Sequence, residues 1–481
     1  MLTRTAYQPK LPRWTHQNNA LRAVNGADAF ALFMEMRTGK TKCILDEFGQ
    51  DEAVGLIKNL LVIAPGGVFR TWEADAIKHL SNDLERRTMI ACWESGPTAA
   101  QKRDLRHFMD YYTGPRIFLV NVEALSTATG ASVQCEKFLA SGPTTIVIDE
   151  STTIKNRKAK RTKLCIKLGD MASKRRILSG LPSPQSPLDV YSQFDFLGAP
   201  LTERYSDFQD RYAIVQNKMF GGRLVEDVVG YKNLEELQAR IQPYSFRVRL
   251  SDCYELPAKM YIRREVEMTE AQEIAYGQMV EYAVAELENA ERVTATIILT
   301  QMLRLHQILC GVTMSDSGVE TDIDENRTDE MMNILENTDG KAIIWAAYGA
   351  NVRRITERIQ KKYGPGSVAR FWGGNEETRE DEERAFKTDP KCRFMVATAA
   401  AGGRGRTWGV ADTIIYYSNT FSLDHRVQSE ERAQAVGKTD RVAYFDLMVP
   451  GTVEQKIIDT LRNKMKLSDA VTGDDPRNWI V

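Results

Sequence analysis

The chain has 481 residues, of which 43% are hydrophobic and 27% are charged, and its formal net charge is −1. At one domain per ~150 residues, this length predicts about three units, or two large lobes with insertions. The near-zero charge excludes a global basic field, so any contact with nucleic acid must come from local basic patches.

The apolar runs and the cysteines exclude further classes of protein. No apolar run approaches the ~18 residues of a membrane span, and residues 1–17 lack the apolar core of a secretory signal. The seven cysteines are scattered, odd in number and never spaced as CxxC, which argues against a disulfide framework and against a zinc site. We therefore expect a cytoplasmic monomer that makes no contact with membranes.

Short apolar runs rich in strand-forming residues fall into two groups along the chain. Because they are apolar on both faces and are separated by stretches that suit helices, they predict parallel strands covered by helices. Each group therefore predicts one doubly wound α/β lobe. The first group comprises residues 60–65, 116–122, 144–150 and 175–180, and the second comprises residues 341–348, 368–374, 393–399, 412–419 and 441–449.

Between the two groups, the pattern changes to helical periodicity with charged faces, as in residues 233–241 and 269–293. Residues 315–330 are acidic and poor in apolar side chains, which indicates a solvated linker. We expect three parts along the chain. They are a first ATP-binding lobe over residues 1–200, a helical insertion and linker over 201–330, and a second lobe over 331–481.

The strongest local signal is MEMRTGKTKCIL at 34–45, where Gly39, Lys40 and Thr41 end a phosphate-binding loop before a helix. Glycine lets backbone amides approach phosphate oxygens, Lys40 would reach the β- and γ-phosphates, and Thr41 would ligate Mg²⁺. The full GxxxxGK[ST] pattern requires glycine at position 34, where methionine stands, and a helix start with a solvent-facing lysine is the alternative. The loop residues expected to contact ATP are Arg37, Thr38, Gly39, Lys40 and Thr41.

An acidic pair, Asp149 and Glu150, ends the third apolar run. Opposite a phosphate loop, Asp149 would hold Mg²⁺ and Glu150 would polarise the attacking water. An acidic pair at a strand end also serves as a simple helix N-cap, so the two residues alone are weak evidence. Their position at the third apolar run after the phosphate loop is what makes the pair informative.

A basic run follows the acidic pair, because residues 155–167 hold seven Lys or Arg and no acid. A charge run is usually a solvated helix face. Its position directly after the acids favours contact with the phosphates of a nucleic acid. The residues expected to make that contact are Lys155, Asn156 and Arg157.

The second group of strands contains a glycine-rich turn and a polar helix. The turn, at 398–417, places Gly402 and Gly403 where the backbone could approach nucleic-acid phosphate or a neighbouring helix. Gln428 and Arg432 lie one helical turn apart, and an arginine directed at a γ-phosphate is worth roughly 10³–10⁵ in rate. An exposed helix with ordinary charges is the alternative.

In order and chemistry these segments resemble helicase superfamily two, specifically its Swi/Snf-type DNA-translocating branch, over about residues 12–465. His16 and Gln17 look like its adenine-reading motif, and MRTGKT looks like motif I. IDESTTIKN at 148–156 is similar to its DEAH box with the following lysine and asparagine, and Trp72 stands where the branch usually has tryptophan. The resemblance implies two RecA-like lobes that bind ATP and Mg²⁺.

The most specific part of the resemblance is ILSGLPSPQSPLDVYSQFDFLGAP at 177–200, in which we expect Ser179 and Gly180 to meet nucleic acid. Leu181 and Gln185 depart from the branch's pattern there, and a proline-rich loop before a packing helix is the alternative. The compact chain looks like versions carried by phages and mobile elements.

One departure bears on turnover. The branch's last motif has two arginines three residues apart, whereas here Arg432 is followed by Ala435 at the second position. Loss of that positive charge should slow hydrolysis steeply even if ATP and DNA still bind. Three explanations stay open: an engineered trapping substitution, a naturally slow motor, or replacement by another arginine. The candidate replacements are Arg404, Arg406 and Arg441.

The sequence thus predicts a DNA-dependent ATPase that translocates along double-stranded DNA, remodelling DNA structures or displacing bound proteins. An RNA or single-strand helicase of the same superfamily is one alternative, which the segments at 177–200 and 201–330 disfavour. The other is an ATP-gated DNA-binding module with little turnover, which Ala435 alone favours.

Overall fold

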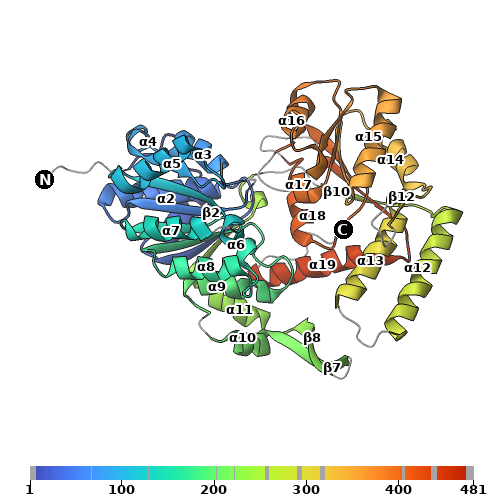
Figure 1. Ribbon diagram of the computed structural model, residues 1–481, viewed down its shortest axis with the longest axis horizontal. Coiled ribbons are helices and arrows are strands. Elements are labelled where there is room, and N and C mark those ends of the chain that lie inside the picture. The colour runs from blue at the N-terminus through green and yellow to red at the C-terminus, as the bar shows by residue number, and fades with distance from the viewer. Residues whose placement is uncertain are drawn as a thin grey trace. The chain divides into compact units, whose positions relative to one another are not determined.

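The computed structural model describes residues 7–66, 68–127, 129–201, 203–220, 223–254, 259–289, 295–314, 320–402, 407–434 and 441–472. The chain forms two compact units, each with its own parallel sheet (Figure 1). Unit 1 comprises Met1–Ile214, Gly230–Glu255 and Leu467–Asn478, and unit 2 comprises Val215–Val229, Leu256–Lys466 and Trp479–Val481.

Unit 1 holds a seven-stranded sheet in the order β3-β4-β2-β5-β6-β1-β9. All of its neighbouring strands pair in parallel, so the carboxyl ends of the strands share one edge. The strands are β1 (Ala29–Met34), β2 (Asn59–Ala64), β3 (Met89–Cys92), β4 (Arg116–Asn121), β5 (Thr144–Ile148), β6 (Lys174–Leu178) and β9 (Ser245–Val248).

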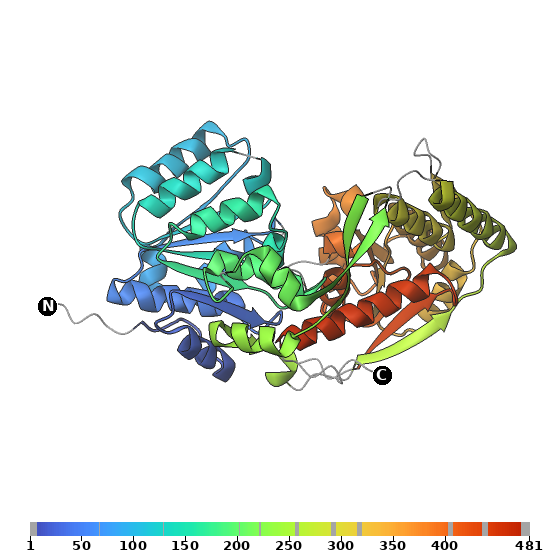
Figure 2. The ribbon, with the colours of Figure 1, turned by 90° about the horizontal axis from the view of Figure 1, so that it is seen from below.

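Alternate residues of these strands enter two separate apolar clusters, one on each face of the sheet. In β2, Leu61 and Ile63 belong to one cluster, and Leu60 and Val62 belong to the other. Helices therefore cover both faces, as Figures 1 and 2 show. The first face is covered by α5 (Ala99–Arg106), α6 (Ala124–Thr127), α7 (Thr129–Ala140), α8 (Lys160–Gly169), α9 (Val190–Leu197), α10 (Tyr205–Tyr212) and α11 (Leu234–Ile241), and the second by α1 (Thr15–Val24), α2 (Lys40–Val54), α3 (Thr71–His79) and α4 (Asn82–Arg87).

Unit 2 holds a six-stranded parallel sheet in the order β10-β17-β16-β13-β15-β14. Its strands are β10 (Lys259–Glu265), β13 (Lys341–Trp345), β14 (Val368–Phe371), β15 (Phe394–Ala397), β16 (Ala411–Tyr416) and β17 (Val442–Met448). Its helices are α12 (Glu270–Asn289), α13 (Ala295–Leu309), α14 (Arg327–Glu336), α15 (Gly349–Tyr363), α16 (Arg379–Thr388), α17 (Ala399–Gly402), α18 (Leu423–Glu430) and α19 (Val453–Thr472), the last of which continues into unit 1.

Two short antiparallel pairs complete the described strands. They are β7 (Ala213–Phe220) with β8 (Arg223–Tyr231), and β11 (Val312–Met314) with β12 (Glu320–Asp322). Among the helices of the described residues, none combines the length and the apolar character that crossing a membrane would require.

The predicted fold class, two doubly wound α/β lobes with parallel sheets, is confirmed. Residues 201–330 are more than a helical insertion, however, because they supply β9 to the sheet of unit 1 and β10 to the sheet of unit 2. The prediction that the acidic stretch at 315–330 is a solvated linker is wrong for the last residues of that stretch. Arg327 begins α14 there and is only 1% exposed.

A buried ion pair fixes α2 on the sheet of unit 1. The Arg176 Nη2 atom of β6 lies 2.5 Å from Glu47 Oε1 of α2, and Arg176 also donates to the carbonyl oxygens of Ala27 and Asp28. A buried arginine is tolerated only when its charge and its donors are satisfied in this way. The pair therefore positions the helix whose first residue is Lys40.

Candidate nucleotide-binding site

Three of the predicted motifs meet at one edge of the sheet in unit 1. The strands β5, β6 and β1 are consecutive neighbours and parallel, so their carboxyl ends lie side by side, about 4.8 Å apart. The acidic pair follows β5, Ser179 and Gly180 follow β6, and the phosphate loop follows β1. Ligands of open α/β sheets bind at this edge, outside the carboxyl ends of the strands.

The phosphate loop has the backbone of an anion-binding turn. Arg37 and Gly39 have φ angles of 67° and 87°, both in the left-handed region, and α2 begins at Lys40. Such a turn followed by the amino-terminal amides of a helix forms a concave surface that suits phosphate oxygens. A left-handed conformation costs a non-glycine residue roughly 1–2 kcal/mol, so Arg37 stores strain of the kind that functional loops carry.

The missing glycine at position 34 does not obstruct the loop. Met34 is the last residue of β1, and its side chain is buried in the apolar core. Its carbonyl oxygen accepts a hydrogen bond of 2.7 Å from Lys40 Nζ. The departure from the full pattern therefore falls in the strand and leaves the space for phosphate unaltered.

Residues from α1 support the loop from behind. Gln17 is buried, and its Nε2 donates to the carbonyl oxygen of Thr38 at 3.2 Å, while His16 Nε2 lies 2.8 Å from the same oxygen. A side chain on Gly39 would place its Cβ 2.3 Å from Gln17 Nε2, so that amide would have to move, and the positive φ of Gly39 itself favours glycine. The structure thus places Gln17 against the phosphate loop, and its contact with adenine stays a prediction.

The acidic pair lies beside the loop. Asp149 is buried and accepts hydrogen bonds of 2.9 Å from Trp72 Nε1 and from the backbone N–H of Glu150. Burial raises the pKa of Asp149, against the opposing charge of Lys40 and the two hydrogen bonds. Because Lys40 acts on this carboxylate, the structure brings together the predicted phosphate-binding lysine and the predicted acid.

A contact that the sequence did not reveal joins the loop to the turn after β6. Arg247 of β9 donates to the carbonyl oxygen of Gly180 at 2.9 Å, and its Nη2 atom lies 3.4 Å from Glu35 Oε1. The backbone N–H of Leu250 donates to the other oxygen of Glu35 at 2.8 Å. A Cβ on Gly180 would lie 3.4 Å from the Cα of Glu35, so the turn and the loop pack backbone to backbone.

The basic run begins directly after the acidic pair. A short helical turn, Ser151–Ile154, separates Glu150 from Lys155, and α8 begins at Lys160. Asn156 and Arg157 are exposed, whereas Lys155 is half-buried. The Arg157 guanidinium stacks on the Tyr205 ring, 4.1 Å from its centroid.

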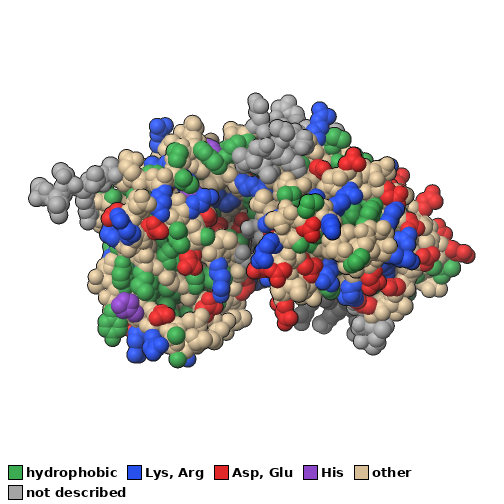
Figure 3. Space-filling view, turned by 90° about the horizontal axis from the view of Figure 1, so that it is seen from above, with side chains coloured by type: hydrophobic (Ala, Val, Ile, Leu, Met, Phe, Trp, Pro, Cys, Tyr) green, Lys and Arg blue, Asp and Glu red, His purple; other side chains and the backbone are tan. Residues whose placement is uncertain are grey.

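The face of the molecule seen in Figure 3 is of mixed charge. Figure 3 shows Lys and Arg interspersed with Asp and Glu over one face of the molecule, which accords with the net charge of −1. A local run such as that from Lys155 to Lys167 is therefore the kind of feature through which phosphate could be bound.

The remaining predicted residues belong to unit 2. Gln428, on α18, is buried, and its Nε2 donates to Asp424 Oδ1 at 2.6 Å. Arg432 follows the same helix and is 1% exposed. Gly402 ends α17, and a Cβ there would lie 2.8 Å from the Trp408 ring, which gives this glycine a packing role. Gly403, Arg404, Arg406 and Ala435 lie outside the described residues, and Arg441 is exposed immediately before β17.

Family comparisons agree with this arrangement of motifs. Residues 16–314 match the SNF2-related domain. The chain belongs to the SNF2-related family. Residues 326–443 match the helicase conserved C-terminal domain.

The individual relatives share low sequence identity with this chain and are longer than it is. A Bacillus subtilis protein named as an ATP-dependent helicase/translocase, YwqA, is 22% identical over 92% of this chain and 47% of its own length. The SWI/SNF-related matrix-associated actin-dependent regulator of chromatin subfamily A-like protein 1 of Xenopus tropicalis is 24% identical over 85% of this chain and 40% of its own length. The chain thus spans about half, or less, of these curated relatives.

Solved structures include the Sulfolobus solfataricus SWI2/SNF2 ATPase core in complex with double-stranded DNA. It is 21% identical to this chain, and the match covers 98% of this chain and 96% of that one with a TM-score of 0.43.

The buried acid makes a testable contribution to stability. Since burial raises the pKa of Asp149 above its ordinary 3.8, the folded state keeps this proton where the unfolded chain has lost it. The folded state then binds more protons, so stability falls as pH rises from 3.8 through the raised pKa and levels off above it. Without nucleotide or Mg²⁺, we expect the wild type to lose stability relative to Asp149→Asn across that window.

Urea unfolding at a series of pH values measures this difference. Asp104→Asn, which alters an exposed carboxylate on α5, is the matched control and should follow the wild type at every pH. If the free energies of unfolding of the wild type and of Asp149→Asn change with pH in parallel, burial of the Asp149 carboxylate does not destabilise the fold as proposed.

Proposed function

We propose that this chain is a DNA-dependent ATPase that moves along double-stranded DNA without separating its strands. The observation that carries the proposal is the meeting of Lys40 and Asp149 at the edge of the sheet, with an exposed basic segment starting a few residues after Glu150. Movement of this kind would remodel DNA structures or displace bound proteins.

The nucleotide would bind at the phosphate loop. Lys40 would exchange the carbonyl oxygen of Met34 for phosphate oxygens, and the amides at the start of α2 would complete the cradle. The carboxylate of Asp149 and the hydroxyl of Thr41 are hard oxygen donors of the kind that Mg²⁺ prefers. Once bound, this ion would neutralise charge on the phosphates. Glu150 would hold the attacking water and accept its proton.

A short, hydrogen-bonded turn would couple DNA binding to hydrolysis. The backbone N–H of Thr153 donates to the carbonyl oxygen of Glu150 at 2.9 Å, and Arg161 donates to the carbonyl oxygen of Thr153 at 2.8 Å. A phosphate bound at Asn156 or Arg157 would therefore act on Glu150 through one stiff turn.

The character of the basic run favours contact with a phosphate backbone over recognition of bases. Residues 155–167 contain no aromatic side chain, whereas proteins that bind single strands stack successive bases on aromatic rings. Charge without stacking gives binding that ignores base sequence and weakens with salt. The roles of Gln428 and Arg432 at the γ-phosphate stay predictions from the family resemblance.

Lys40→Ala should abolish DNA-stimulated ATP hydrolysis. Loss of the ammonium removes the charge that stabilises the phosphates in the transition state, so we expect a fall of at least about a hundredfold. Phosphate release with and without duplex DNA measures it, and Lys102→Ala, an exposed lysine on α5, is the matched control. Unchanged turnover in Lys40→Ala would mean that the nucleotide site lies elsewhere.

Removal of the exposed charges after Glu150 should weaken DNA binding and its dependence on salt. For Arg157→Ala combined with Lys158→Ala and Lys160→Ala, we expect the slope of log K against log salt for duplex DNA to fall by up to about 2.7. Fluorescence anisotropy at several salt concentrations measures the slope. Lys167→Ala is the control, because that ammonium already pairs with Glu136 at 2.8 Å.

The same assay with single-stranded DNA and with RNA tests the substrate. Tighter binding and stronger ATPase stimulation by either of these than by duplex DNA would favour an RNA or single-strand helicase and would contradict double-strand translocation.

A DNA-binding module with little turnover is a second candidate, and Ala435 is the specific observation that favours it. If the missing arginine limits hydrolysis, Ala435→Arg should accelerate DNA-stimulated turnover roughly 10³-fold, at the lower end of the effect of an arginine finger. Steady-state ATPase assays measure the change, and Ala435→Gln controls for side-chain size. No acceleration, together with brisk turnover of the wild type, would show that another residue supplies the charge.

A further inference from the structure

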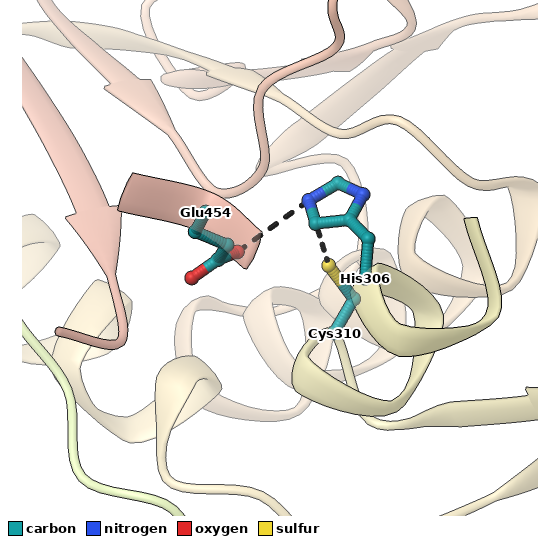
Figure 4. A group of neighbouring side chains, drawn as sticks. All are labelled: His306, Cys310 and Glu454. Atoms are coloured by element: carbon teal, nitrogen blue, oxygen red, sulfur yellow. Dashed lines mark hydrogen bonds and ion pairs between the residues drawn. The ribbon is translucent and has the colours of Figure 1, made fainter. Parts of the chain in front are cut away.

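We propose that His306, Cys310 and Glu454 form a zinc-binding site inside unit 2, whereas the phosphate loop belongs to unit 1 (Figure 4). This runs against the expectation from the cysteine pattern, which predicted no zinc site. The proposal is independent of the proposed DNA translocation, because it concerns a cluster that the nucleotide chemistry does not use.

The three side chains come from two helices that lie far apart in the sequence. His306 lies on α13 and Cys310 directly follows that helix, so the two residues are one helical turn apart and project from the same face. Glu454 is in the first turn of α19. Figure 4 shows all three side chains pointing toward one another.

Their donor atoms are spaced as zinc ligands are. His306 Nε2 lies 3.4 Å from Glu454 Oε1 and 3.7 Å from Cys310 Sγ, and all three donor atoms lie within 4.8 Å of one another. Ligand atoms around a tetrahedral zinc are about 3.3–3.6 Å apart, given bond lengths near 2.0 Å to nitrogen and oxygen and 2.3 Å to sulfur. Two of the separations therefore already fit, and the third needs only a small movement.

Each of two ligands is held in place by a further partner. His306 Nδ1 is 2.7 Å from the hydroxyl of Tyr348, so the Nε2 atom is the one that faces the cluster. Glu454 Oε2 accepts hydrogen bonds from Arg327 at 2.6 Å and from the backbone N–H of Val449 at 2.8 Å, which leaves Oε1 to the cluster. Metal-binding histidines and carboxylates are typically oriented by second partners of this kind.

The burial and charge of the cluster suit a divalent ion. All three side chains are buried, with exposed fractions of 4%, 0% and 4% for His306, Cys310 and Glu454. The charged and titratable groups near them include Arg327, Tyr348, Tyr417 and Tyr276, and also Arg354, whose Nη1 donates to the carbonyl oxygen of Cys310 at 3.3 Å. Zinc would bind the Cys310 thiolate, the Glu454 carboxylate and the neutral His306 imidazole, so the two anionic ligands would balance the charge of the ion within this buried site.

Without a metal, the cluster would be an ion-pair network. Burial opposes the charged imidazolium, but Cys310 and Glu454 outweigh it and raise the pKa of His306 to about 10. Burial likewise favours the neutral acid, yet Arg327 and His306 lower the pKa of Glu454 to about 2. This network is the alternative that the experiment must exclude.

The mixture of ligands selects among metal ions. Thiolate and imidazole favour zinc, whereas Mg²⁺ and Ca²⁺ prefer sites made of oxygen. Zinc held by these three residues, with its fourth position left to water, would join the end of α13 to the start of α19, two segments whose apolar side chains already share one buried cluster.

Titration of the full-length, chelator-treated protein with Co²⁺ tests the site, since a tetrahedral cobalt thiolate absorbs in the near ultraviolet and the visible. We expect one equivalent of Co²⁺ to produce these bands and Zn²⁺ to displace the bound Co²⁺. Cys310→Ser should lose the near-ultraviolet band. Cys135→Ser, which alters an equally buried thiol outside the cluster, should retain both. Bands that persist in Cys310→Ser would place the metal on other thiols and overturn the proposal.

A measurement on the wild type keeps the proposal testable if Cys310→Ser does not fold. Calorimetry on the wild type should show one Zn²⁺ bound per chain, with an affinity that weakens at acid pH because zinc binds thiolate and neutral imidazole rather than their protonated forms. Lys40→Ala should bind Zn²⁺ as the wild type does, which separates this site from the nucleotide site. Absence of stoichiometric binding would leave only the ion-pair network.

Discussion

The parallel alignment of β5, β6 and β1 is the constraint on which the candidate site depends. Because neighbouring strands run in one direction, three segments that are far apart in the sequence end at the same edge of the sheet. One antiparallel strand in this group would send its motif to the opposite edge, whatever its residues. Parallel strands in turn require helices on both faces, which is why the apolar residues of β2 divide between two separate clusters.

Contacts from outside these strands make the edge rigid. Trp72, on α3, donates to Asp149, and Arg247, on β9, ties the turn after β6 to the end of β1 and to Glu35. The ion pair between Arg176 and Glu47 holds α2, and with it Lys40, against the sheet. A site whose groups must stay within tenths of an ångström needs supports of this kind as much as it needs the motif residues themselves.

All nine predicted runs are strands, but other strands were missed for two different reasons. β1 is apolar on both faces, yet its sequence AFALFM has no β-branched residue, whereas β3 and β10 are only partly buried. The motif residues could be predicted because their chemistry is local. Arg247 could not, because its role arises from the pairing of β9 with β1, and the cluster at His306 could not, because Glu454 enters it from a distant helix.

The electrostatics of the edge explain why a nucleotide should arrive together with a cation. In the described state, the Lys40 ammonium bonds to Met34 and its field partly offsets the cost of the buried Asp149 carboxylate. Phosphate oxygens carry full negative charge, whereas the Met34 carbonyl offers only a dipole, so a triphosphate would draw the Lys40 ammonium away from both. Asp149 would then be a buried charge without its partner. A buried ion that lacks a partner costs several kcal/mol of free energy, as an order of magnitude. A metal ion bound with the phosphates would remove the cost of the unpaired Asp149 charge. Lys40 and Asp149 together would therefore make the binding of the nucleotide and the binding of its cation depend on each other.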